Sequence, residues 1–159
     1  MVAKPTPAKF SFEQIFEREL DIEKLGIKAP IVLSGSDDEK YINDLLAKGI
    51  VSYPDYKLPE EGGPTVLIGH SSVYPWVKTK YGTIFAKLNK LVQGDKITIY
   101  SGGKRFDYSV IRTEVVVYGP ENYKKLENIS NKTLVLITCW PPGTTKSRFL
   151  VFAELSQGF

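Results

Sequence analysis

Residues 133–155 read TLVLITCWPPGTTKSRFLVFAEL, and this stretch decides which class of fold the chain adopts. Residues 133–138 form a short apolar run, which is typical of a buried strand. Residues 148–155 form a second run of the same kind. Residues 140–147 between them are predicted to be a loop, because two adjacent prolines cannot join the central ladder of a sheet. The stretch therefore predicts two strands around a rigid loop, with Cys139 at the end of the first.

The remaining segments extend this pattern and predict a mainly β protein. Residues 96–100 and 105–110 flank Ser-Gly-Gly-Lys, a hairpin signal, and the strand pattern continues to Tyr118. Pro30 restricts its strand to an edge or an end. No regular alternation of strands and helices is sustained, so seven or eight short strands with two or three short helices indicate a mostly antiparallel barrel or sandwich. The other predicted strands cover residues 25–34, 50–53 and 65–70.

Short helices are expected between the strands. Ser36 and Glu39 have the spacing of a capping box, and Gly49 is a stop signal for the helix that follows them. Further along, Phe85, Leu88 and Val92 share one helical face. The predicted helices cover residues 12–20, 36–49 and 83–92, and residues 121–128 are expected to form one helical turn or two.

The composition indicates one ordinary globular domain. With 159 residues, 42% of them hydrophobic and 25% charged, the chain can bury a core without disulfide bonds. A net charge of +3 is too small to indicate a nucleic-acid partner, which normally needs a clustered basic face. No run reaches the ~18 apolar residues that a membrane helix needs. We expect a tail or linker over residues 1–10 and a single domain over residues 11–159.

Cys139 and His70 are the one cysteine and the one histidine of the chain. A single cysteine excludes an internal disulfide, and the two residues are too few for a structural zinc site. The 18 acidic residues leave an oxygen-ligated calcium site open, but none of them lies in an EF-hand pattern, so we assign no metal ligands and expect no cofactor. Each ends a predicted buried strand ahead of a loop, where its side chain can meet solvent. If the two strands share a sheet, the imidazole can accept the proton of the thiol and return it. The ordinary alternatives are a small buried cysteine and a structural histidine.

Arg148 is the third candidate, because it opens the last predicted strand shortly after Cys139. A loop of that length can fold back so that the guanidinium faces the thiol. A guanidinium is always charged and offers several donors in a fixed fork, so it can stabilise a thiolate or an oxyanion. The alternative is a solvated charge at a strand end, and Lys146 nearby is a weaker match to the same role.

These segments together resemble one family, the sortases. Ile-Thr-Cys at 137–139, ahead of a loop and Arg148, resembles the Thr-Leu-x-Thr-Cys signature and the strand-borne arginine of that family. TVLIGH at 65–70 is similar to the sortase strand that ends in the catalytic histidine, and residues 81–100 resemble the stretch that follows it. The resemblance covers roughly residues 25–155, with Val135 in place of the first Thr. It implies a sortase-like closed β-barrel.

The resemblance also implies an activity, a cysteine transpeptidase that anchors surface proteins. Cys139 would attack the Thr carbonyl of a Leu-Pro-x-Thr-Gly-like sorting signal and form a thioacyl-enzyme. His70 would protonate the leaving Gly amine and then deprotonate the incoming amine of a cell-wall peptide or a pilin Lys. Arg148 would hold the carbonyl oxygen or the substrate backbone. We expect a soluble domain at the extracellular face of the bacterial membrane, tied to that membrane only through an anchor outside this chain.

Four further residues have two interpretations each. Thr138 either offers its hydroxyl or amide to the substrate or pairs with backbone at a strand end. Trp140 either walls a substrate groove or caps the barrel. Tyr74 and Trp76, on either side of Pro75, either shape the groove or pack under their loop, and we expect the second.

Two rival functions use the same residues. A hydrolytic cysteine peptidase would share the Cys–His pair and differ in what resolves the thioester, so an amine acceptor separates the two. A non-catalytic β-barrel that binds peptides would leave Cys139 inert to thiol reagents.

A different family of cysteine transpeptidases that act on cell walls has His and Cys almost adjacent in a Ser-His-Gly-Cys cluster. The wide separation of His70 from Cys139 argues against that family.

Overall fold

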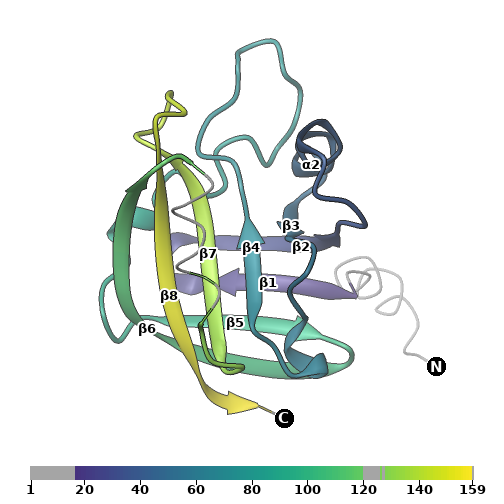
Figure 1. The fold of residues 1–159 in the computed structure, drawn as a ribbon, viewed down its shortest axis with the longest axis vertical. Coiled ribbons are helices and arrows are strands. Elements are labelled where there is room, and N and C mark those ends of the chain that lie inside the picture. The colour runs from purple at the N-terminus through teal and green to yellow at the C-terminus, as the bar shows by residue number, and fades with distance from the viewer. Residues whose placement is uncertain (1–16, 120–125, 127, 159) are drawn as a thin grey trace, which may run out of the picture.

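The protein forms a closed barrel of eight strands in the computed structural model, which describes residues 17–119, 126 and 128–158 (Figure 1). The order around the barrel is β1-β2-β3-β4-β7-β8-β6-β5. Two neighbouring pairs are parallel, β2 with β3 and β4 with β7, and the others are antiparallel. The predicted mainly β barrel is thus confirmed. The strands are β1 Arg18–Ile22, β2 Ile27–Leu33, β3 Ile50–Ser52, β4 Thr65–Ile68, β5 Lys96–Ser101, β6 Lys104–Val117, β7 Thr133–Trp140 and β8 Ser147–Gly158.

One α-helix, α2 (Glu39–Leu46), lies in the described part of the chain and connects the parallel strands β2 and β3. It begins at Asp38, whose carboxylate accepts a hydrogen bond from the Tyr41 N–H at 3.1 Å. The predicted cap, Ser36, instead accepts a hydrogen bond from the Asp38 N–H, so the helix is confirmed but its start is not. The other turns are short 3-10 segments, η1 Glu23–Leu25, η2 Pro59–Glu61 and η3 Leu88–Lys90.

The helix expected over residues 12–20 is wrong where the structure describes it. Residues 18–20 belong to β1, while residues 12–16 lie outside the described part. Leu20 and Ile22 are fully buried with the half-exposed Asp21 between them, which is the alternation of a strand. The short helix expected over residues 121–128 lies almost wholly outside the described residues as well.

The helix expected over residues 83–92 is also wrong. This segment makes successive tight turns, with η3 as its one helical piece. Phe85, Leu88 and Leu91 are buried at intervals of three residues, which matches the three residues per turn of 3-10 geometry. Val92, expected to be part of the apolar face, has 58% of its surface exposed.

Pro30 lies inside β2, not at its end, and faces Glu19 of β1. Pairing between β2 and β3 begins only at Ile31, opposite Ile50. Pro30 therefore sits where the strand has a partner on one side, which is the situation that a proline tolerates in a sheet.

Apolar side chains form two separate layers on β7. Leu134 and Leu136 point into the barrel and join its main core with residues such as Phe85 and Leu20. The alternate residues Val135 and Ile137 point to the other face of the strand and pack in a second cluster, which we call the outer cluster. Its buried members are Val66, Val116, Leu126, Val135, Ile137, Leu150 and Phe152, and Ile68 packs against them.

Candidate active site

The pairing of β4 with β7 brings His70 beside Cys139. These strands run parallel, with Ile68 opposite Ile137, and the Gly69 N–H extends the ladder by donating to the Ile137 carbonyl at 3.1 Å. His70 and Cys139 each lie two residues further along. Adjacent strands are about 4.8 Å apart, and residues two apart point to the same face of a strand. Both side chains therefore lie on the face that carries the outer cluster, above Ile68 and Ile137.

Arg148 reaches the same face from the other side of Cys139. The strands β7 and β8 are antiparallel, and Cys139 lies directly opposite Arg148 in their register. Arg148 is two residues from Leu150, a member of the outer cluster, so its side chain leaves β8 on that face. The structure thus brings the three predicted residues together at one edge of the sheet, with His70 just beyond the end of β4, Cys139 on β7 and Arg148 on β8. We call these three residues the Cys–His–Arg row.

The backbone of His70 is fixed by a buried phenylalanine. The Phe85 N–H donates to the His70 carbonyl at 2.9 Å. The ring of Phe85 packs directly on Gly69, where an added Cβ would meet the ring at 2.6 Å, so only glycine fits there. The imidazole is half-buried, and its burial lowers the pKa of His70 below the usual 6.5 because the charged form loses solvent. His70 is therefore mainly neutral at neutral pH.

The hydroxyl of Thr138 links the ends of β4 and β7. It is buried and donates to the Gly69 carbonyl at 2.7 Å, directly between the residues that precede Cys139 and His70. Its side chain lies on the barrel-interior face of β7, opposite to that of Cys139. Of the two interpretations, backbone pairing describes this hydroxyl, and a substrate contact through the Thr138 amide stays a prediction.

Trp140 lies on the interior face as well and caps the core. It packs against the main core, and its ring centroid is 5.1 Å from that of Phe149. A role in binding substrate stays a prediction for its remaining surface. Tyr74 and Trp76 differ from expectation, because they stack on each other with centroids 4.8 Å apart and are 68% and 72% exposed. They do not pack under their loop.

A residue that the sequence patterns did not single out contacts Arg148. The guanidinium carbon lies 4.1 Å from the ring centroid of Tyr118, just beyond the end of β6. The Arg148 Nη1 also donates to the carbonyls of Thr145 and Ser147 at 3.0 and 3.1 Å. The contact of Tyr118 with Arg148 follows from the pairing of β6 with β8, which brings distant parts of the chain together, and no local sequence pattern indicates it.

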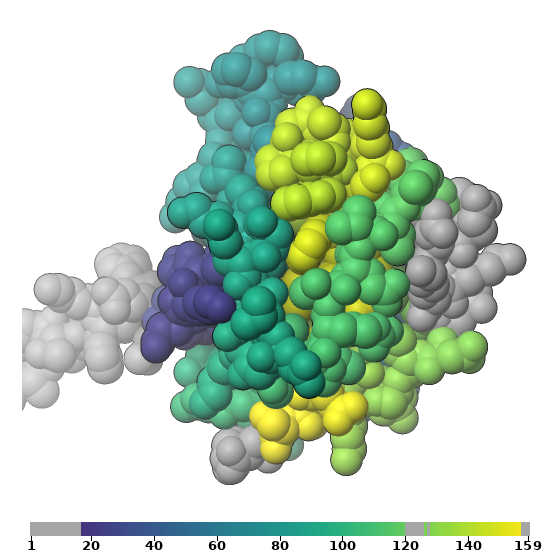
Figure 2. All heavy atoms as spheres, turned by 90° about the vertical axis from the view of Figure 1, so that its left-hand side faces the viewer, coloured from purple at the N-terminus to yellow at the C-terminus, as the bar shows by residue number. Residues whose placement is uncertain are grey.

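The connections that leave β4 and β7 stand at the same end of the barrel (Figures 1 and 2). They are linked by a hydrogen bond from the Gly143 N–H to the Ser72 Oγ at 2.9 Å. The connection after β4 is also tethered near α2, because the Thr79 hydroxyl donates to the carbonyl of Ala47, which directly follows that helix. The end of the barrel that carries the Cys–His–Arg row is therefore bordered by two tethered loops.

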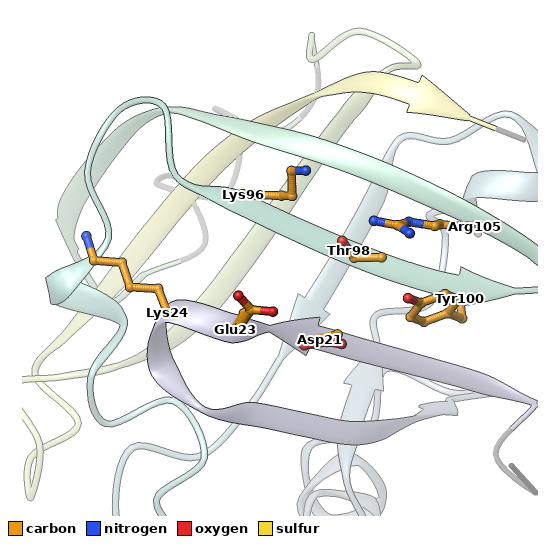
Figure 3. A pocket seen from close by; sticks show the side chains of 7 residues that line it. All are labelled: Asp21, Glu23, Lys24, Lys96, Thr98, Tyr100 and Arg105. Carbon is orange, nitrogen blue, oxygen red and sulfur yellow. The ribbon is translucent and has the colours of Figure 1, made fainter. Parts of the chain in front are cut away.

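A separate hollow of about 510 Å³ lies on the outer face of β1 and β5 (Figure 3). These strands close the barrel on the side away from β4 and β7 in the strand order. Its charges are partly neutralised, because Lys24 pairs with Asp95 at 2.7 Å and Arg105 with Asp107 at 3.1 Å. The lining residues are Asp21, Glu23, Lys24, Lys96, Thr98, Tyr100 and Arg105, and none of them belongs to the Cys–His–Arg row.

The described residues contain no group of three or more His, Cys, Asp or Glu side chains that could hold a metal ion. No helix among them is both long and apolar enough to cross a membrane.

The chain belongs to the sortase family, since residues 20–156 match the model of the sortase domain. The resemblance seen in the sequence is thereby confirmed. Sortase A of Bacillus anthracis is 23% identical over 154 residues, a match that covers 97% of this chain and 66% of that protein. The chain therefore spans slightly less than two thirds of this curated relative.

Solved sortase structures share the fold. Sortase C-1 of Actinomyces oris has a TM-score of 0.73 at 25% identity, with 99% of this chain and 85% of that chain covered. Sortase C-3 of Streptococcus pneumoniae has a TM-score of 0.70 at 28% identity, with 91% and 64% covered. Sortase A of Corynebacterium diphtheriae has a TM-score of 0.72 at 24% identity, with 98% and 72% covered, a likeness in fold. Sortases of different named types thus match this barrel about equally well.

Proposed function

We propose that this domain is a cysteine transpeptidase. It cleaves a Leu-Pro-x-Thr-Gly-like sorting signal between Thr and Gly and transfers the Thr carbonyl to an amine, which anchors surface proteins. The observation that carries the proposal is the Cys–His–Arg row, in which strand register places Cys139 between His70 and Arg148 on one face of the barrel. Membership of the sortase family supports the same activity.

In the first half-reaction, the Cys139 sulfur attacks the Thr carbonyl carbon, and its proton passes to His70. The tetrahedral intermediate then expels the Gly amine, which takes that proton from the imidazolium, and a thioester to Cys139 remains. The lowered pKa of His70 favours this role, because a neutral imidazole is needed to accept the thiol proton. An imidazole alone among side chains exchanges protons readily in both directions near neutral pH.

In the second half-reaction, an incoming amine attacks the thioester, and His70 removes its proton as the new amide forms. The thiolate leaves and recovers a proton from the imidazolium, so the enzyme returns to its starting state. Arg148 faces Cys139 across the β7–β8 ladder, and its guanidinium stabilises the oxyanion in both half-reactions. Water in place of the amine gives slow hydrolysis.

The acceptor amine belongs to a cell-wall peptide or to a pilin lysine. Similar solved structures include one described as a pilus-related sortase C of Group B Streptococcus, with a TM-score of 0.72 at 26% identity. That description concerns the relative, so both acceptors enter the test of this chain. The expected place of action is the extracellular face of the bacterial membrane.

Mass spectrometry tests the proposal directly. The protein is incubated with a Leu-Pro-x-Thr-Gly peptide library and either a Gly-rich amine or a Lys-containing peptide, beside Cys139→Ala. We expect a joined product that is absent with Cys139→Ala, and an acyl-enzyme adduct on intact wild-type protein. The choice between Gly and Lys amines then identifies the acceptor class.

Two outcomes favour the alternatives. Cleavage with no joined product at high amine concentration indicates a hydrolytic cysteine peptidase. No cleavage, together with a thiol that does not react with iodoacetamide, indicates a barrel that binds peptides without chemistry. His70→Asn and Arg148→Gln serve as further variants, since each removes one end of the row while leaving Cys139 in place.

A further inference from the structure

Arg148 needs a fixed orientation for the role given to it above. Its side chain has many rotamers, and an oxyanion is stabilised only by donors that already point to it before reaction. Strand register fixes where the Arg148 backbone lies, but not where its guanidinium points. The contacts made by that guanidinium are therefore part of the site.

Register places Tyr118 next to Arg148 on the same face of the sheet. Arg148 lies directly opposite Val116, a buried member of the outer cluster. Tyr118 is two residues beyond Val116, and its N–H donates to the Lys146 carbonyl at 3.1 Å, which continues the β6–β8 ladder. Tyr118 and Arg148 are thus diagonal cross-strand neighbours, a spacing of about 7–8 Å that aromatic and long side chains can bridge.

The guanidinium is held on two sides. The ring of Tyr118 lies against its face, with the carbon at 4.1 Å from the ring centroid, a cation–π arrangement. Along one edge, Nη1 makes two hydrogen bonds to the carbonyls of Thr145 and Ser147. A guanidinium has five N–H donors, so these two bonds use both donors of Nη1 and leave those of Nε and Nη2 for other partners.

We propose that Tyr118 is a positioning residue for the transpeptidation reaction. Its ring and the two carbonyls fix the plane of the Arg148 guanidinium, which leaves the Nε and Nη2 donors for the carbonyl of the substrate at Cys139. This role rests on the proposed function. The Tyr118 side chain is 49% exposed, and its ring contact with Arg148 is the contact through which it acts on the site.

Kinetics of four proteins test the role: wild type, Tyr118→Phe, Tyr118→Leu and the control Tyr100→Leu. Tyr100 is also partly exposed, at 37%, but lies at the hollow on the far side of the barrel. Acyl-enzyme formation from the sorting peptide is followed in single turnovers. We expect Tyr118→Leu to slow this step about two- to fivefold, which corresponds to the free energy of a cation–π contact at an exposed site, and to change KM little. Tyr118→Phe keeps the ring and stays within about twofold, as does Tyr100→Leu.

A second comparison shows whether the effect passes through Arg148. In an Arg148→Gln background, Tyr118→Leu should have no further effect, because residues that act as a unit are not additive. NMR supplies a readout that needs no substrate: the Arg148 side-chain protons should be shifted upfield by the ring in wild type and Tyr118→Phe, and should lose that shift in Tyr118→Leu. This spectrum also shows that each variant is folded, and Tyr118→Gln replaces Tyr118→Leu if the latter is not.

The outcomes separate the two proposals. An active wild type whose Tyr118→Leu variant is equally fast overturns the positioning role and leaves the transpeptidase function standing. An equal loss on removing the ring in the Arg148→Gln background also overturns it, since the ring would then act elsewhere. A wild type that forms no acyl-enzyme with any sorting peptide overturns the proposed function, and the role of Tyr118 in that reaction with it.

Discussion

Replacing Thr138 by valine removes one hydrogen bond at the ends of β4 and β7, beside the candidate catalytic residues Cys139 and His70. The Thr138 hydroxyl donates to the Gly69 carbonyl at 2.7 Å and is almost completely buried. Valine has nearly the same shape, so the change leaves the volume intact and leaves the Gly69 carbonyl without this donor. A buried polar group that loses its partner costs about 1–3 kcal/mol. A loss of about 2 kcal/mol lowers the Tm of a domain of this size by about 4–8 °C.

The same change should also lower kcat, by more than the loss of stability alone would explain. His70 follows Gly69 directly, so loosening this contact lets the imidazole shift relative to Cys139. A misplacement of about 1 Å can cost about a hundredfold in rate, so we expect kcat to fall about ten- to a hundredfold. The measurements are thermal unfolding by circular dichroism and the transpeptidation rate with saturating peptide.

Two controls make this prediction specific. Thr138→Ser keeps the hydroxyl and should retain most of the activity. Thr98→Val removes another buried hydroxyl, one that donates to Asp107 at 2.8 Å on the far side of the barrel, so it should lower the Tm without lowering kcat. If Thr138→Val melts at the wild-type temperature, or loses stability but no more activity than Thr98→Val, the positional reasoning is wrong.

Four further predictions concern residues near the site. Burial lowers the pKa of His70, so the NMR titration of this one histidine should have its midpoint below 6.5, and a midpoint at or above 6.5 contradicts the geometry. Because the folded state resists protonation, the stability from neutral His70 is complete above pH 6.5 and is lost as the pH falls through the folded-state pKa, a dependence that His70→Asn should abolish. Gly69→Ala places a Cβ at 2.6 Å from the Phe85 ring and should cost about 1–3 kcal/mol in urea denaturation, with partial recovery when Phe85→Leu is added. Replacing both Tyr74 and Trp76 by alanine should lower the free energy of unfolding by less than about 1.5 kcal/mol, because the exposed rings mainly contact each other; a larger loss in the same assay would mean that they support the loop.

The place of Cys139 and His70 at one edge of the sheet could be predicted, because each of these two residues, the one cysteine and the one histidine, ends an apolar run. Arg148 could be predicted to lie near Cys139 for a similar reason, because it is the first residue of the predicted apolar strand that follows a proline-containing loop. In each case the signal is local: a chemically distinctive side chain stands where a buried strand meets a loop. The family resemblance adds the expectation that the three residues act together.

The features that were missed depend on contacts between distant segments. The segment 83–92 has apolar residues compatible with an α-helix, but packing of Phe85 on Gly69 and burial of Leu91 select tighter turns. Tyr118 looked like the last residue of a strand, and only the β6–β8 register shows that its ring meets Arg148. Tertiary contacts of this kind override local propensity, which is a weak preference by comparison.

The barrel topology explains why one end of the sheet holds the whole row. Parallel neighbours end at the same edge, so His70 after β4 and Cys139 near the end of β7 necessarily meet there, although 69 residues separate them. An antiparallel neighbour begins where its partner ends, so Arg148 at the start of β8 arrives at that same edge. A different strand next to β7 in place of β4 would remove His70 from Cys139 without changing a residue of either. The parallel β4–β7 pair, fastened by Thr138, is therefore the structural element on which the proposed chemistry depends.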